Sequence, residues 1–205
     1  MGLISSTDRA PQPDRRTWLL LAVFAAFALR LSAASPPGLR LPDLDNQLVD
    51  PFQTAADTKA IVFLFISVDC PISNRYAPEI RRLSEKFGAR GVVFRLVYPN
   101  PAESPEAIRG HLKDYRYPAS AMRDPRQQLA KFAKATITPE AALFDKQGRR
   151  LYLGRIDDRY VNIGLERPAP TRHDLEEALD ATLAGTPVQE PIAPAVGCYI
   201  ADFAQ

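Results

Sequence analysis

The sequence predicts an α/β domain in which a mixed sheet carries helices on both faces, a three-layer sandwich. Residues 61–66 form a continuous apolar run, which is typical of a strand buried on both faces. Apolar residues at helical spacing follow as far as Phe87, and residues 92–98 form a second strand. Strand, helix and strand in this order predict a right-handed parallel crossover, and a later hairpin adds antiparallel strands.

Turn and capping signals assign the elements on either side of this unit. Residues 39–50 are expected to form a small hairpin around a polar turn. Ser104 is predicted to cap a helix that has Pro105 in its first turn. A short strand over 119–122 follows, and Asp124 is predicted to open the next helix.

The last third of the domain is predicted to contain a hairpin and one helix. Residues 136–144 form a strand with a proline near its start, 145–148 form the turn, and 150–156 form the returning strand. Residues 171–174 match a capping box, so a helix is expected to begin there and to end at Gly185.

Composition indicates a globular protein with a neutral body. Of the 205 residues, 46% are hydrophobic and 24% are charged. The net charge is +2, but residues 1–34 contain four Arg and two Asp, so the rest of the chain has equal numbers of basic and acidic residues. A neutral body gives no electrostatic reason to expect nucleic acid as a partner. The two cysteines allow at most one intramolecular bridge, and no haem or zinc motif occurs, so no cofactor and no metal is predicted.

Residues 1–34 are predicted to be a signal peptide. Arg15 and Arg16 precede a twelve-residue apolar run, 18–29, and small residues stand before a cut after Ala34. The run is well short of the roughly 20 apolar residues that span a bilayer. The twin arginines resemble a twin-arginine export signal, and an uncleaved leader acting as a membrane anchor is the alternative. Export predicts a periplasmic or cell-surface location, where a disulfide can persist.

Domain boundaries follow from these signals. We expect a linker over 35–38, a single domain over 39–185, and a proline-rich tail over 186–205 that carries Cys198. A membrane is expected as a partner only if the leader stays uncleaved.

Cys70 is the residue around which a site is predicted. It lies where the buried strand ends and a helix begins, and Pro71 suits the first helical turn. The positive end of a helix dipole there favours thiolate, the reactive form of the sulfur. The alternative is that Cys70 is a small buried hydrophobic residue, as many free cysteines are.

The order of elements resembles the thioredoxin fold. Cys70-Pro71-Ile72-Ser73 resembles the redox motif of that fold with its second cysteine replaced by Ser73, and Thr138-Pro139 resembles its cis-proline loop, which faces the active cysteine. The last third is similar to exported bacterial redoxin-domain proteins of the peroxiredoxin and thiol-specific-antioxidant group; the similar segments are 154–160, 167–175 and 195–198.

This resemblance implies roles for several residues. Cys70 is the expected nucleophile, and Ser73 is the expected hydrogen-bond donor to its thiolate. The residues expected to face the substrate are Ser67, Pro71, Thr138, Pro139 and Arg155.

The chain also departs from the known active sites of this fold. A dithiol enzyme needs a second cysteine to release its mixed disulfide, and Ser73 cannot do that. A peroxiredoxin has a proline seven residues before its cysteine, where this chain has Phe63, although Ser67 matches the Thr or Ser three residues before. Copper chaperones of this fold have a second cysteine where Asn74 stands.

Cys198 is the only other thiol in the chain, and three interpretations of it are open. It is a resolving thiol on a tail mobile enough to reach Cys70, a structural disulfide partner, or a free cysteine packed in the tail. A bridge between the two would close a loop of more than a hundred residues, worth roughly 4–5 kcal/mol in the chain-entropy model.

The charged segment 155–159 also has two interpretations. Arg155 forms a rim near Cys70 that stabilises an anion, or the segment is a solvated loop of surface ion pairs. His111 and His173 have no ligand-spaced partner in the sequence, so neither predicts a metal site.

Together these observations predict an exported redoxin that acts through Cys70 on peroxides or disulfides. Its partners would be a thiol, disulfide or peroxide substrate and an unknown reductant. The alternative is a non-catalytic binding module that keeps the fold and uses the cleft to hold a protein or peptide.

Overall fold

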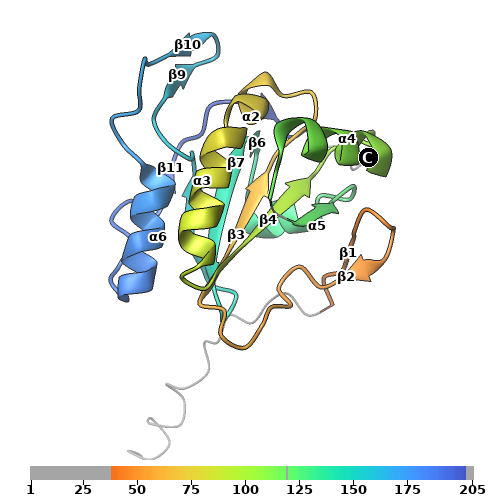
Figure 1. Cartoon of the computed structure of the whole chain (residues 1–205), viewed down its shortest axis with the longest axis horizontal. Coiled ribbons are helices and arrows are strands. Elements are labelled where there is room, and N and C mark those ends of the chain that lie inside the picture. Colours follow the sequence, from red (N-terminus) through yellow and green to blue (C-terminus); the bar gives the residue numbers. More distant parts are fainter. Residues whose placement is uncertain (1–37, 119, 202–205) are drawn as a thin grey trace, which may run out of the picture. The chain divides into compact units, whose positions relative to one another are not determined.

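The computed structural model describes residues 38–118 and 120–201, so the predicted leader over 1–34 lies outside it. A six-stranded sheet with the order β11-β8-β7-β3-β4-β5 forms the centre of the domain (Figure 1). Its strands are β3 (Ala60–Phe65), β4 (Val92–Tyr98), β5 (Ser120–Arg123), β7 (Glu140–Asp145), β8 (Arg150–Gly154) and β11 (Ile192–Ala193).

The sheet is mixed, as the sequence predicts. β3, β4 and β5 are parallel, whereas β7 runs antiparallel to both β3 and β8. β3 lies inside the sheet and all six of its residues are buried, which explains why its sequence is continuously apolar. The chain turns polar only after β3, at Ser67, so the residues that lead to Cys70 follow directly from a buried strand.

Helices cover both faces of the sheet, which confirms the three-layer architecture. Side chains alternate along β3, so Val62 and Leu64 pack in the cluster that contains α3 and α6, and Phe63 packs with α5. Figure 1 shows α3 and α6 on one face of the sheet and α5 behind it. The helices are α2 (Pro71–Arg75), α3 (Ala77–Gly88), α4 (Pro105–Tyr115), α5 (Gln128–Ala133) and α6 (Asp174–Ala184).

The helical pattern after Cys70 is divided into two helices, where one was expected. α2 ends at Arg75 and α3 begins at Ala77, with Tyr76 between them. Pro78 has no N–H to donate and its ring crowds the carbonyl four residues earlier, so a continuous helix cannot pass through this point. The interruption leaves Cys70 at the start of a helix of only five residues.

The predicted capping residue is confirmed for α4, whereas α5 begins later than predicted. Ser104 Oγ accepts a hydrogen bond from Ala107 N at 3.2 Å, as expected. Asp124 does not open a helix directly, because its carboxylate accepts from Gln128 N and Ala130 N at 2.8 and 2.9 Å. The helix therefore begins four residues later, at Gln128.

The predicted capping box at residues 171–174 is wrong. His173 is the N-cap of α6 and makes no side-chain capping bond. The Thr171 hydroxyl instead donates to Asp158 Oδ2 at 2.6 Å, and Asp174 accepts from Arg155. Gly185 ends the helix in a left-handed conformation, as predicted.

Short strand pairs complete the domain. β1 (Leu41–Pro42) and β2 (Leu48–Val49) form the predicted hairpin. The strand expected over 136–144 is divided at the cis peptide bond between Thr138 and Pro139, giving β6 (Ile137–Thr138) and β7. The pair β9 (Tyr160–Asn162) and β10 (Leu165–Glu166) forms a hairpin that follows β8.

The tail after Gly185 packs on the domain as two strands. β11 lies parallel to β8 at the sheet edge, and β12 (Cys198–Tyr199) pairs with β6. A Cβ at Gly154 would lie 2.0 Å from Ala193 O, so the close approach of β11 requires a glycine there. Within the described residues, no helix is long and apolar enough to cross a membrane.

Replacing Gly154 should detach this edge strand. We expect Gly154→Ala to lower the free energy of unfolding by about 1–3 kcal/mol, because its methyl group displaces Ala193. Gly110→Ala is the matched control: a Cβ there meets nothing within 4 Å inside α4, so it should raise stability by about 0.5–1 kcal/mol. Urea denaturation measures both, and equal stabilities for the two variants would contradict the packing of β11.

Candidate active site around Cys70 and Cys198

Cys70 lies between the end of β3 and the start of α2, against the cis-proline loop. Its side chain is 1% exposed, and Sγ donates to Thr138 O at 3.0 Å. Thr138 precedes Pro139 through the cis peptide bond. The predicted contact between Cys70 and this loop is therefore present.

A buried glutamate holds the segment that leads into Cys70. Glu103 Oε1 accepts from both Ser67 Oγ and Val68 N at 2.7 Å. Burial raises the pKa of Glu103, and the two hydrogen bonds counteract part of that effect. The sequence analysis did not identify Glu103, because it lies in a loop 36 residues beyond Ser67.

A chain of polar side chains supports the same segment from the helix side. Asn74 Nδ2 donates to Val68 O at 3.1 Å, so its Oδ1 accepts from His111 Nε2 at 2.7 Å. His111 Nδ1 then accepts from Tyr98 Oη at 2.8 Å. Burial lowers the pKa of His111, which favours the neutral ring, and the Asn74 amide that donates to Val68 sets the direction of this chain.

Cys198 lies beside Cys70 because β12 crosses the cis-proline loop. Cys198 pairs with Thr138 across the two strands, and Thr138 Oγ1 donates to Cys198 O at 3.3 Å. A Cβ at Gly197 would lie 2.0 Å from Thr138 O, so only glycine permits this approach. The tail reaches Cys70 as a paired strand, and the structure shows the two cysteines as separate thiols.

The pKa values of the two thiols are shifted in opposite directions. Burial raises the pKa of Cys70, but the hydrogen bonds that the side chains and backbone of Ser73 and Cys198 offer to the thiolate outweigh this effect, and the net pKa is lowered. Partial burial, with further contributions from Cys70, raises the pKa of Cys198 to about 11. Cys70 therefore ionises first, and the Cys198 thiol stays protonated beside it.

Ser73 is a buried neighbour of Cys70, and its role as a donor to the thiolate stays a prediction. It is fully buried, and Ser73 Oγ has no hydrogen-bond partner among the described residues while Cys70 is a thiol whose proton faces Thr138. A buried hydroxyl without a partner costs free energy, and the Cys70 thiolate supplies one. Ionisation of Cys70 thus gives the Ser73 hydroxyl a hydrogen-bond acceptor, which it lacks while Cys70 is neutral.

An apolar groove of about 470 Å³ opens beside Cys198. One wall is the first turn of α2, with Pro71 and Ile72, and another wall is the β9–β10 hairpin. Gly197, Cys198 and Tyr199 of the tail form its third side. A smaller cavity of about 90 Å³ lies on the other side of the tail.

The structure brings most of the predicted site residues together but not all of them. Pro71 lines the groove, and Ser67 and Thr138 line the smaller cavity. Arg155 is directed elsewhere, because its guanidinium donates to Asp174 at 2.7 and 3.2 Å, and it lines neither cavity. That Arg155 faces a substrate stays a prediction.

The charged segment around Arg155 is a buried network and not a solvated loop. Asp157 accepts from Tyr76 Oη at 2.5 Å, and both carboxylates of the segment are almost fully buried. Asp158 accepts from Thr171 N at 2.7 Å. These bonds fix the loop that follows β8 and the start of α6.

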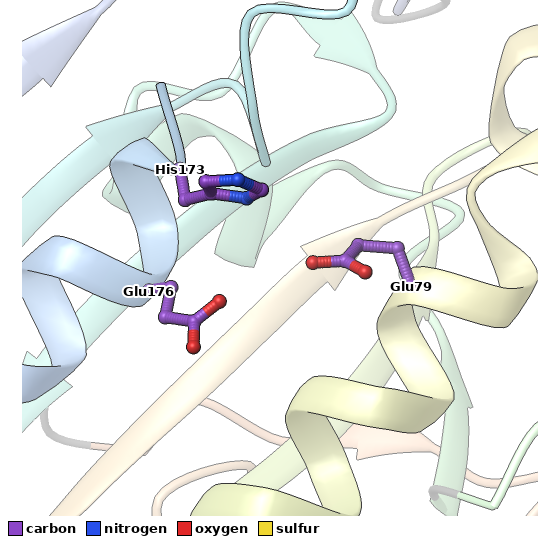
Figure 2. Close-up of side chains that lie close together, drawn as sticks. All are labelled: Glu79, His173 and Glu176. Carbon is purple, nitrogen blue, oxygen red and sulfur yellow. The ribbon is translucent and has the colours of Figure 1, made fainter. Parts of the chain in front are cut away.

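His173 has acidic neighbours that the sequence did not indicate. Figure 2 shows Glu79 of α3 facing His173 and Glu176 at the start of α6, and their ligand atoms lie within 4.8 Å of one another. Arg82 and Lys86 already bind these carboxylates, and the bond from Arg82 is the main reason that the pKa of Glu176 falls to about 2. A metal ion would have to displace both cations, so this cluster is best described as a link between α3 and α6.

A cysteine that follows a central strand and contacts a cis-proline loop defines a protein of the thioredoxin fold. Over residues 30–162 the chain matches the Redoxin family, so it belongs to that family. No functionally characterised, curated protein matches the chain.

Solved structures share the fold of this chain. An uncharacterized conserved protein from Geobacillus kaustophilus is 30% identical, with a TM-score of 0.70, over 83% of this chain and 91% of that one. A hypothetical protein from Sinorhizobium meliloti is 28% identical, with a TM-score of 0.69, over 82% and 92%. A putative thiol:disulfide interchange protein DsbE from Chlorobium tepidum shares the fold at 19% identity and a TM-score of 0.54, over 73% and 96%.

Removing the Ser73 hydroxyl should make Cys70 less acidic without destabilising the protein. We expect Ser73→Ala to raise the apparent pKa of the first thiol to ionise, because the thiolate loses a donor. The free energy of unfolding at low pH should not fall, since the Ser73 hydroxyl has no hydrogen-bond partner while Cys70 is protonated. Thiolate absorbance titration measures the pKa, with Ser84→Ala on α3 as the control, and an unchanged pKa in Ser73→Ala would contradict the assignment.

Proposed function

We propose that the chain is a thiol–disulfide oxidoreductase in which Cys70 and Cys198 alternate between two thiols and one disulfide. The observation that supports this proposal is the pairing of β12 with β6, which holds Cys198 beside Cys70 over Thr138. The second thiol that the 70–73 motif lacks is thereby supplied from the tail.

The acidities of the two thiols suit this reaction. Thiol–disulfide exchange needs a thiolate to attack and a stable thiolate to leave, and Cys70 has the lowered pKa that serves both steps. Cys198 keeps its proton until it enters the disulfide. As the bond forms, the two electrons of the pair pass to the disulfide substrate, whose two sulfurs leave as thiols, and Cys198 gives up its proton. The Redoxin family assignment is consistent with a thiol or disulfide substrate.

Peroxide chemistry is the second candidate, since a Cys70 thiolate can be oxidised to a sulfenic acid that Cys198 then condenses with. Thiol–disulfide exchange is favoured because the Ser67 hydroxyl donates to Glu103 and the Arg155 guanidinium donates to Asp174, and the contact given for the Cys70 sulfur is with Thr138 O.

For the location of the protein we propose export, with the leader over 1–34 as its support. An oxidising compartment outside the cytoplasm would allow a Cys70–Cys198 disulfide to persist.

Mild oxidation of the full chain should join the two cysteines. We expect mass mapping after alkylation to find one Cys70–Cys198 disulfide, and catalysis of exchange with glutathione disulfide should disappear in Cys70→Ser. Peroxide consumption that depends on Cys70 would favour the second candidate. A wild-type protein that forms no disulfide and exchanges no faster than Cys70→Ser would leave only a binding module.

The disulfide should also stabilise the folded chain. Closing a loop of this length is worth roughly 4–5 kcal/mol in the chain-entropy model. Stabilisation of the Cys70 thiolate in the reduced protein offsets part of that gain. We expect dithiothreitol to lower the Tm of the wild type but not that of Cys198→Ser. A Tm independent of reductant in both proteins would contradict the bridge.

A further inference from the structure

The two sulfurs of the proposed redox pair differ in their access to solvent. Cys70 is 1% exposed, beneath Thr138 and the tail, whereas Cys198 is exposed. Cys198 lines both the apolar groove and the smaller cavity on the other side of the tail, and Cys70 lines neither. A partner that meets the disulfide with the tail in place can therefore reach only one of its sulfurs.

We infer that partner thiols attack Cys198, and that the groove beside it selects a protein cysteine flanked by apolar side chains. This inference rests on the proposed function, since it requires that Cys70 and Cys198 form a disulfide. It assigns to Cys198 the role of the sulfur that meets the partner, and to Cys70 the role of the leaving group.

The chemistry of the groove identifies the kind of segment that would bind. Ile163, Leu165 and Tyr199 line it and are 71%, 57% and 82% exposed, which is unusual for large apolar side chains gathered at one place. The charges at its edge cancel, because Arg75 and Glu166 bind each other at 2.8 Å. The groove therefore favours uncharged apolar side chains, and it is continuous with the reacting sulfur.

The size of the groove is consistent with a short peptide. Its volume of about 470 Å³ lies within the range of ordinary ligand sites, roughly 300–1,000 Å³. Cys198 forms part of its wall, so a cysteine in a peptide seated there would have its thiol next to Cys198. The apolar neighbours of that cysteine would then contact the β9–β10 hairpin and Tyr199.

The exchange balances without an additional reactant. A partner thiolate attacks Cys198 Sγ, the Cys70–Cys198 bond breaks, and the electron pair stays on Cys70 Sγ. A second partner thiolate then attacks the partner sulfur of the mixed disulfide and releases Cys198, which takes up a proton. Two partner thiols become one disulfide, and the protein gains two electrons.

The leaving group is well suited to its position. The rate of exchange rises as the pKa of the departing thiol falls, and the pKa of Cys70 is the lower of the two. The released thiolate is received by Ser73 and by the backbone N–H groups of Ser73 and Cys198. Attack on Cys70 would instead release Cys198, which has a raised pKa and is the poorer leaving group.

Two synthetic monothiol peptides test the inference on the oxidised full chain. They are N-acetyl-Leu-Cys-Leu-amide and N-acetyl-Ser-Cys-Ser-amide, which differ only in the residues beside the cysteine. Rapid acid quenching, alkylation and mass mapping should find the first mixed disulfide on Cys198, with Cys70 alkylated. The leucine peptide should react about tenfold faster, which corresponds to about 1.4 kcal/mol.

Matched variants separate the groove from general hydrophobicity. The double variant Ile163→Ser with Leu165→Ser should reduce the rate ratio of the two peptides to near one. Leu48→Ser removes a similarly exposed residue, 66% exposed on β2, which does not line the groove, and it should keep the ratio.

Each contrary result has its own meaning. A first mixed disulfide on Cys70 overturns the attack on Cys198, and equal rates for the two peptides overturn the selection by the groove. Both results leave the redox pair intact. A protein that forms no Cys70–Cys198 disulfide overturns the proposed function, and this inference with it.

Discussion

The structure of the site depends on one short strand pairing, β12 with β6. Two residue pairs, Cys198 with Thr138 and Tyr199 with Ile137, bring a tail cysteine to a buried cysteine 128 positions earlier in the chain. The Thr138 carbonyl is the centre of this arrangement, because it accepts from Cys70 Sγ and lies directly beneath Gly197. Without this pairing Cys70 would be a single thiol beside Ser73, which cannot resolve a mixed disulfide.

The rest of the tail supports that pairing. β11 fixes the chain at the edge of the sheet through Gly154, only a few residues before the tail turns toward the cis-proline loop. The same tail closes the site, since it covers Cys70 and leaves Cys198 at the wall of the apolar groove. A glycine at each of two contacts therefore permits both the close approach of Cys198 to Cys70 and the covering of Cys70 by the tail, on which the proposed redox pair depends.

The sequence predicted the parts of the fold that follow a repeated pattern. The apolar run of β3 indicated a buried central strand, and Cys70 and Pro139 were identified from their positions relative to two strands. Contacts made by single residues far apart in the chain could not be predicted in this way. Glu103, His111 and the neighbours of His173 leave no periodic signal, and a two-residue strand such as β12 is too short to have one. The ion pair between Arg155 and Asp174 was not predicted for a related reason, because Asp174 had been assigned to a helix cap.

The most direct test of the account is the effective concentration of Cys70 and Cys198 toward each other, measured by equilibrating the folded chain with a glutathione redox buffer. Flexible tethers give effective concentrations in the millimolar range even when they are short. If β12 holds the tail in place, the effective concentration in the folded protein should lie well above the millimolar range. In urea it should fall to the value of a flexible chain. The same value in folded and urea-unfolded protein would contradict the pairing of β12 with β6 as the basis of the site.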